Sequence, residues 1–151
     1  SGSGVIALVA AMKGWDVVAS DVDVVSTYNT LYNSKMNRLN AKMNVTCADL
    51  LSHIRSSSLA LVVSNPPYMP CRRTSYNDPI CAGEQLELIQ ALLREAYRVL
   101  KDNGVLLLCL GKDSIDTVLK FMSELGLKTE IVDRKGVVLD EIYVVKAIKK
   151  R

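Results

Sequence analysis

The sequence predicts one α/β domain with a doubly wound, mostly parallel sheet, helices on both faces and a C-terminal antiparallel hairpin. Strand-like and helix-like runs alternate through the first two thirds of the chain, a pattern typical of parallel sheets covered by helices. Two strand-like runs then finish the chain, separated by the turn-forming residues Arg134-Lys135-Gly136. The length of 151 residues suits a single domain, because domains usually hold about 100–200 residues.

The expected helices repeat apolar residues every three or four positions, and the expected strands are short, nearly continuous apolar runs. Residues 5–13 are apolar at almost every position, which predicts a buried helix, whereas residues 24–40 predict an amphipathic helix. The run from Asn65 to Gly83 contains all four prolines and is expected to be a loop. The other helices are expected at 84–101 and 114–125, and the strands at 15–20, 44–48, 59–64, 105–110, 127–133 and 138–148.

The first expected helix opens on Ser1-Gly2-Ser3-Gly4, with no strand before it. Doubly wound sheets place a parallel strand at that point. We therefore expect residues 1–151 to form a single domain whose first strand is missing from this sequence.

Composition argues against several classes of protein. Apolar residues make up 49% and charged residues 23% of the chain, which argues against wholesale disorder. The net charge of +3 is too small for a surface devoted to nucleic acid. No apolar run reaches the roughly 18 residues of a membrane span, and no signal peptide is recognisable. We expect a soluble cytoplasmic protein, with the nucleus as a second location.

Cysteine and histidine usage argues against a metal site. The four cysteines, Cys47, Cys71, Cys81 and Cys109, form no C-x-x-C pair, and His53 is the only histidine. We expect no metal ligand in this chain and four reduced, mostly structural thiols.

The glycine run and the acid after the next strand predict a site for a nucleotide-like cofactor. Gly2, Ser3 and Gly4 open a helix, and their small side chains let a ligand approach the N–H groups at its N-terminus. Asp21 follows the next strand, where doubly wound folds place an acid that hydrogen-bonds a ribose. The alternative is that Asp21 or Asp23 caps the helix that begins near residue 24.

Asp49 follows the third segment in the same way, with Leu50 and Leu51 after it. A carboxylate there can accept a hydrogen bond from the exocyclic amine of a nucleobase, while the leucines flank the ring. Capping of a following helix is an equally good interpretation.

Asn65-Pro66-Pro67-Tyr68 is the most specific motif in the chain. It directly follows a buried strand, at the carboxyl edge where open α/β sheets bind ligands. Two successive prolines fix the backbone, so the Asn65 side-chain oxygen and the Pro66 carbonyl can accept both hydrogens of a planar NH₂ group. Tyr68 offers a ring on which a planar amide or base can stack. We expect Asn65, Pro66 and Tyr68 to be catalytic, and a purely structural turn is the alternative.

These motifs resemble those of class I S-adenosylmethionine-dependent methyltransferases that modify amide or exocyclic nitrogens. More closely, the chain resembles the eukaryotic and archaeal branch of the HemK-like glutamine methyltransferases. The segments that carry this resemblance are SGSGV, SDVD, ADLL, VVSNPPY, the DNG turn and GKDS.

The resemblance implies a Rossmann-like fold and N5-methylation of the glutamine in the Gly-Gly-Gln motif of a class 1 translation release factor. It implies that S-adenosylmethionine binds Gly2, Ser3, Gly4, Asp21, Asp49, Leu50 and Asn65, and that the substrate binds Asn65, Pro66, Pro67 and Tyr68. The loop at 69–83 is shorter than that of the family, which leaves the roles of Arg72 and Arg73 open.

Other functions remain as alternatives. The same motif would accept the amine of adenine, so N6-adenine methylation is the nearest rival, although few residues are left to grip and flip a base. Methylation of protein lysines is another alternative. A nucleotide-binding module without catalysis is the third, and the intact Asn65 and Tyr68 argue against it.

We also expect this chain to act as half of a heterodimer. The strand at 44–48, NVTCA, carries no charge or proline and should lie at the edge of the sheet, where another chain can pair with it. Tyr28, Tyr32, Met36 and Met43 add apolar surface nearby, with core packing as the competing explanation. The enzymes that the chain resembles are activated by a small zinc-binding protein that covers such an edge, so any zinc would belong to the partner.

Overall fold

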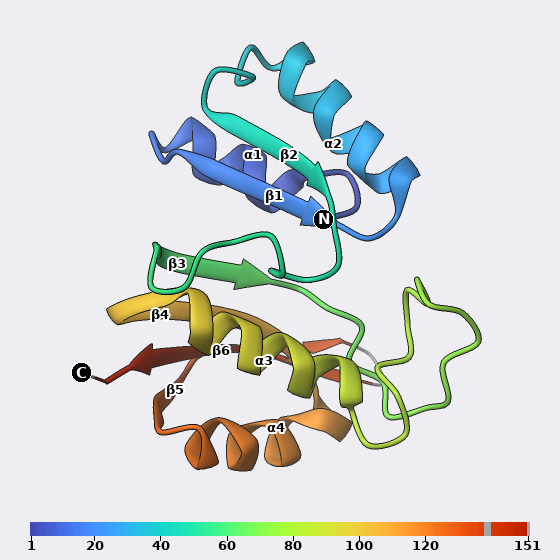
Figure 1. Cartoon of the computed structure of the whole chain (residues 1–151). Coiled ribbons are helices and arrows are strands. Elements are labelled where there is room, and N and C mark those ends of the chain that lie inside the picture. Colours follow the sequence, from blue (N-terminus) through green and yellow to red (C-terminus); the bar gives the residue numbers. More distant parts are fainter. Residues whose placement is uncertain (138–139, 151) are drawn as a thin grey trace. The chain divides into compact units, whose positions relative to one another are not determined.

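The computed structural model describes residues 1–137 and 140–150 of the chain (Figure 1). The chain divides into two compact units, Ser1–His53 and Ile54–Arg151. Each unit has its own sheet, and each is described separately below. Among the described residues, no helix has the length and apolar character needed to cross a membrane.

The first unit is a β-α-β arrangement preceded by a helix. Its elements are α1 (Val5–Met12), β1 (Val17–Asp21), α2 (Val24–Met36) and β2 (Met43–Cys47). β1 and β2 pair in parallel, from Val17 opposite Met43 to Asp21 opposite Cys47. The core consists largely of small residues, which let α1 approach the strands closely: Ala7, Ala11, Ala19 and Met43.

The burial of α1 and α2 differs from the expectation for both helices. Val5 and Met12 of α1 are exposed, so α1 buries a narrow alanine stripe and is not buried all round. The buried residues of α2 are Thr30 and Ser34, while its large apolar side chains, including Tyr28, face outward. The small residues of α1 pack against Ala19 of β1 and Met43 of β2, and Thr30 of α2 lies against Gly4, just before α1.

The elements of the second unit are β3 (Leu59–Ser64), α3 (Glu87–Val99), β4 (Leu100–Gly111), α4 (Lys112–Glu124), β5 (Leu127–Val137) and β6 (Asp140–Lys149). The strands form a four-stranded mixed sheet, and α3 and α4 pack against it and against each other (Figure 1). β3 and β4 are parallel neighbours, and β6 lies antiparallel between β4 and β5. The predicted α/β class and the antiparallel pairing of the last two strands are therefore confirmed.

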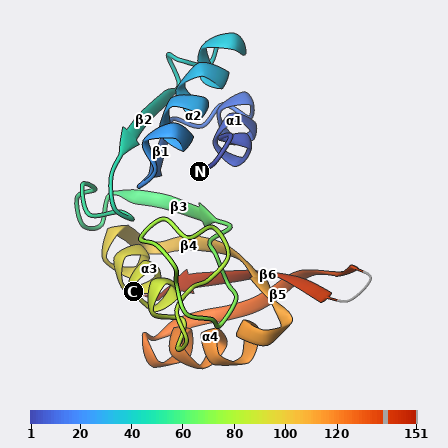
Figure 2. The ribbon, with the colours of Figure 1, turned by 90° about the vertical axis from the view of Figure 1, so that its right-hand side faces the viewer.

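The strand pairing places two expected turns inside strands. Arg134-Lys135-Gly136 belong to β5, and pairing continues to Val137 opposite Asp140; Arg134 forms an ion pair with Glu141 across the hairpin at 2.5 Å. Asp102-Asn103-Gly104 lies in β4 beside an irregularity in its pairing with β3, and Asn103 has a φ of 61°. Figure 2 shows the β5–β6 hairpin extending past the point where β4 ends.

Candidate active site

The glycine-containing turn before α1 is held by side chains from β1 and α2. The Gly2 N–H donates to the Asp21 carboxylate at 3.0 Å. Thr30 and Asn33 of α2 donate to the carbonyl oxygens of Gly2 and Ser3, at 3.2 and 2.9 Å. These hydrogen bonds fix the shape of the turn. The N–H groups of the first turn of α1 have no partner within the helix, so they can bind a ligand.

Gly4 is required by its backbone and by its neighbour. It precedes α1 with a φ of 79°, a conformation that costs other residues about 1–2 kcal/mol. A Cβ atom on Gly4 would also lie 2.7 Å from Cγ2 of Thr30, which is fully buried. The missing side chain of Gly4 therefore serves helix packing, whereas the space beside Gly2 is open.

The structure separates the roles of Asp21 and Asp23. Asp23 caps α2, because its carboxylate accepts hydrogen bonds from the N–H and hydroxyl groups of Ser26, each at 2.8 Å. Asp21 accepts hydrogen bonds from the backbone N–H groups of Gly2 and Asp23, and its carboxylate lies against the nitrogen of Ser1. The interpretation of Asp21 as the cap is wrong, and its position at the end of β1 fits the expected ribose site.

The surroundings of Asp21 keep it ionised. Burial raises the pKa of Asp21, but the hydrogen bonds that its carboxylate accepts, among them those from the N–H groups of Asp23 and Gly2, lower the pKa below its ordinary value. A carboxylate at this position can accept a hydroxyl hydrogen over a wide pH range.

Asp49 lies after β2 on an exposed turn, and no helix follows it in residues 49–54. The alternative of helix capping is therefore wrong for Asp49. Ser20, at the end of β1, donates its hydroxyl to the carbonyl oxygens of Ala48 and Leu50, at 3.3 and 2.9 Å. Ser20 thus holds the Asp49 turn against β1, a role that its type and position in the sequence did not signal.

Asn65-Pro66-Pro67-Tyr68 directly follows β3 in the second unit, as expected. Pro66 is buried and Asn65 is exposed. Within residues 1–137 and 140–150, neither the Asn65 side chain nor the Pro66 carbonyl has a hydrogen-bond partner. Both acceptors are therefore available to a ligand, and the buried Pro66 fixes the backbone between them.

The loop after this motif is organised by Asp78 and by a disulfide bond. Asp78 is 6% exposed and accepts from Thr74, Ile80 and Cys81 at 2.8–3.0 Å. The backbone N–H groups of Cys81, Thr74 and Ile80 hold the pKa of Asp78 far below its ordinary value.

Cys71 and Cys81 form a disulfide, with Cα atoms 5.1 Å apart, so the expectation of four reduced thiols is wrong. A β-bridge between the backbones of Met69 and Cys81 brings the two arms of the loop together. The separation of Cys71 and Cys81 by ten residues in the sequence does not reveal this approach. Closing such a loop stabilises the folded state by about 2–3 kcal/mol.

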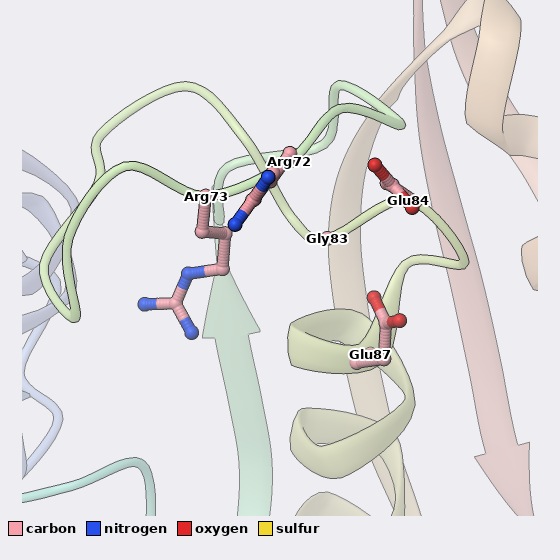
Figure 3. A pocket seen from close by; sticks show the side chains of 5 residues that line it. All are labelled: Arg72, Arg73, Gly83, Glu84 and Glu87. Carbon is pink, nitrogen blue, oxygen red and sulfur yellow. The ribbon is translucent and has the colours of Figure 1, made fainter.

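The same loop forms one wall of a cavity of about 390 Å³. Arg72 and Arg73 line one side, and Glu84 and Glu87, near the start of α3, line the other (Figure 3). Arg73 donates to the Tyr76 carbonyl, and its guanidinium lies 5.7 Å from the centre of the Tyr76 ring. The two arginines that the sequence left without a role thus belong to a cavity with both positive and negative walls.

Comparison with known proteins defines the family. Residues 1–136 match the methyltransferase small domain, so the chain belongs to the methyltransferase small domain family. A curated relative, the release factor glutamine methyltransferase of Aquifex aeolicus (strain VF5), is 23% identical over 143 residues, 87% of this chain and 51% of the relative. The chain thus spans about half the length of this relative.

Solved structures agree on the fold. The YcgJ protein of Bacillus subtilis has a TM-score of 0.77 at 10% identity and covers 99% of this chain and 89% of its own. A methyltransferase from Pyrococcus furiosus has a TM-score of 0.72 at 19% identity, over 97% of this chain and 69% of its own. The chain has the Rossmann-like fold of class I methyltransferases.

Replacing Gly4 should cost more stability than replacing Gly2. Gly4→Ala meets both the positive φ and the Thr30 side chain, whereas Gly2→Ala meets only a φ of 57°. We expect Gly2→Ala to lower the free energy of unfolding by about 1–2 kcal/mol and Gly4→Ala by clearly more. Urea denaturation followed by circular dichroism measures both, and equal losses would contradict the role of Thr30.

Asp78→Asn should loosen the loop at 69–83. The variant loses the negative charge that the three backbone N–H groups bind, so the amides of Thr74, Ile80 and Cys81 should exchange hydrogen faster. Asp102→Asn, at an exposed position, is the control and should change nothing.

Because folding lowers the pKa of Asp78, its contribution is complete above the ordinary value of 3.8 and is lost as the pH falls further. The quantity to follow is the protection of these amides relative to their intrinsic exchange rate at each pH, and a loss of protection above about pH 5 would contradict this assignment.

Proposed function

We propose that this chain is an S-adenosylmethionine-dependent methyltransferase that methylates N5 of a glutamine in the Gly-Gly-Gln motif of a class 1 translation release factor. The observation that carries the proposal is the pair of unengaged acceptors at Asn65 and Pro66, directly after β3. The curated relative, which is named for this activity, supports it.

The acceptors fit the side-chain amide of glutamine. The Asn65 oxygen and the Pro66 carbonyl would accept the two amide hydrogens and hold the nitrogen in one orientation. Hydrogen bonds to both hydrogens disfavour amide resonance and leave the nitrogen lone pair more available. Pro67 keeps the backbone rigid beyond Pro66, and Tyr68 provides a ring for stacking on the planar amide.

The residues of the first unit fit the methyl donor. S-adenosylmethionine supplies an electrophilic methyl group when bound. The Gly2 and Gly4 N–H groups already donate to Asp21 and to the Ser1 carbonyl, so the small residues Gly2, Ser3 and Gly4 would serve to let the cofactor approach the N–H groups of the first turn of α1. The Asp49 carboxylate would accept from its adenine amine beside Leu50.

Asp21 would bind the ribose through its remaining acceptor capacity. The backbone N–H groups of Gly2 and Asp23 already donate to its carboxylate, which has about four acceptor positions. A cytoplasmic location is also part of the proposal.

A methylation assay tests the proposal. The full chain is incubated with radiolabelled S-adenosylmethionine and, separately, with a release factor, with the same factor carrying Gln→Ala in its Gly-Gly-Gln motif, with DNA and with a lysine-rich protein. Label in the intact release factor alone supports the proposal. Label in DNA or in the lysine-rich protein supports N6-adenine or lysine methylation instead, and binding of the cofactor without any transfer supports a non-catalytic module.

Asn65→Ala and Asp21→Ala should separate catalysis from cofactor binding. Asn65→Ala removes an acceptor that orients the reacting nitrogen and should lower kcat by about 100-fold or more, with a smaller effect on cofactor affinity. Asp21→Ala should weaken cofactor binding, measured by calorimetry, by about 1–3 kcal/mol. Turnover within threefold of the wild type in Asn65→Ala would remove Asn65 from the mechanism.

The single domain with an additional first strand also remains a proposal. Among the described residues, β1 pairs only with β2, and β3 pairs only with β4. Each of these strands therefore has a backbone edge with which a further strand can pair.

A small zinc-binding activator is proposed as the partner in a heterodimer. β2 has β1 as its only strand partner in the described part of the chain, so its other edge is available for pairing. Tyr28, Tyr32 and Met36 are 54–67% exposed on the neighbouring helix α2, as the proposal requires. Met43 is buried in the core of the first unit and does not belong to this surface.

Substitutions on the two units test this partner. Val45 packs against the core, so the informative variants are Thr46→Asp on β2 and Tyr32→Asp on α2. Both should release a co-expressed activator in size-exclusion chromatography, because each places a desolvated charge in the interface. Ile131→Asp, on the exposed edge strand β5 of the other unit, is the matched control. An isolated chain that is monodisperse and fully active would refute the heterodimer.

A further inference from the structure

Gly111, the last residue of β4, is packed against the ring of Tyr68. Gly111 is buried, and a Cβ atom placed on it would lie 2.8 Å from both Cδ2 and Cε2 of Tyr68. Carbon atoms in contact are normally about 3.5–4.0 Å apart. Any side chain at position 111 must therefore displace the ring.

The backbone of Gly111 does not itself require glycine. Its φ of −86° and ψ of 166° are open to every residue type. By contrast, Gly4 adopts a positive φ, and so do four other glycines of the described chain. The contact with Tyr68 is therefore the feature of the structure that requires glycine at position 111.

Ser114 fixes the surface on which the ring lies. Its hydroxyl is buried in the first turn of α4 and donates to the Gly111 carbonyl at 3.0 Å. This bond ties the end of β4 to the start of α4. The backbone beside Tyr68 is thus held by the core of the second unit and has little freedom to yield to an added side chain.

We propose that Gly111 is a positioning residue for Tyr68, acting through the ring without touching the substrate. The inference rests on the proposed function, in which the Tyr68 ring stacks on the amide held by Asn65 and Pro66. Stacking and the two hydrogen bonds act together only when the ring and the acceptors have the correct mutual geometry. Displacement of the ring by a methyl group breaks that geometry while the acceptors remain.

Gly111→Ala and its matched control Gly136→Ala test the inference in the methylation assay. Gly136 has an ordinary φ, and no atom lies within 4 Å of a Cβ placed on it. We expect Gly111→Ala to lower kcat/KM for the release factor by at least about tenfold, with unchanged affinity for S-adenosylmethionine, and Gly136→Ala to change neither. A loss smaller than threefold in Gly111→Ala overturns the positioning role.

Gly111 is also the N-cap of α4. A double-mutant cycle distinguishes the positioning of the Tyr68 ring from an effect of Gly111 on the start of this helix. Gly111→Ala in a Tyr68→Ala background, or in Tyr68→Leu if that variant folds better, should change kcat/KM less than twofold. An equal loss with and without the ring overturns the inference. Gly111→Ser adds a second check. If the loss in Gly111→Ala came from a weaker start of α4, Gly111→Ser would keep more activity, because serine is a better helix cap than alanine. Ring displacement instead predicts similar losses in the two variants, and full activity of Gly111→Ser would contradict it.

Nuclear magnetic resonance of ring-labelled tyrosine tests the inference without any substrate. The Tyr68 ring signals should shift in Gly111→Ala and stay in place in Gly136→Ala. Unchanged Tyr68 signals overturn the positioning role even if the chain is an active methyltransferase. A clear shift in a chain that methylates no release factor leaves the Gly111–Tyr68 coupling established and rejects the proposed function instead.

Discussion

The parallel pairing of β3 with β4 is the constraint on which the candidate substrate site depends. Ser64 lies opposite Leu108, so both strands end at the same edge of the sheet. The segment after β3 carries Asn65, Pro66 and Tyr68, and the end of β4 carries Gly111, more than 40 positions later in the chain. Their meeting is a consequence of strand register. A register shift of one residue would replace Gly111 by a residue with a side chain and push the ring away.

In the first unit, a few polar side chains determine the shape of the turn before α1. Its glycine-containing turn has no strand or helix geometry of its own, and it is fixed by the polar side chains of Asp21, Thr30 and Asn33. Thr30 is fully buried and accounts for both the fixed carbonyl of Gly2 and the missing side chain of Gly4. The small residues on the inner faces of α1 and α2 leave large apolar side chains of both helices exposed.

The loop at 69–83 is long and contains no helix or extended strand, yet Asp78 and the Cys71–Cys81 disulfide give it a defined shape. Loops that position functional groups need such local constraints, because few of their backbone groups are paired in secondary structure. The disulfide also restrains residues that line the cavity. Arg72 and Arg73 lie between the two cysteines in the sequence, and Gly83 and Glu84 follow Cys81 closely.

The sequence by itself determined the α/β class, the six strands and four helices to within a few residues, and the motif after β3. These features depend on local periodicity and on proline geometry, which a linear pattern records. Tertiary structure decided the rest. It assigned helix capping to Asp23 and not to Asp21, extended the pairing of β5 with β6 through Gly136 to Val137, joined Cys71 to Cys81 and brought Gly111 against Tyr68. Each of these features depends on contacts between residues that strand register, loop closure or helix packing brings together. The spacing of these residues in the sequence does not reveal the distances between them.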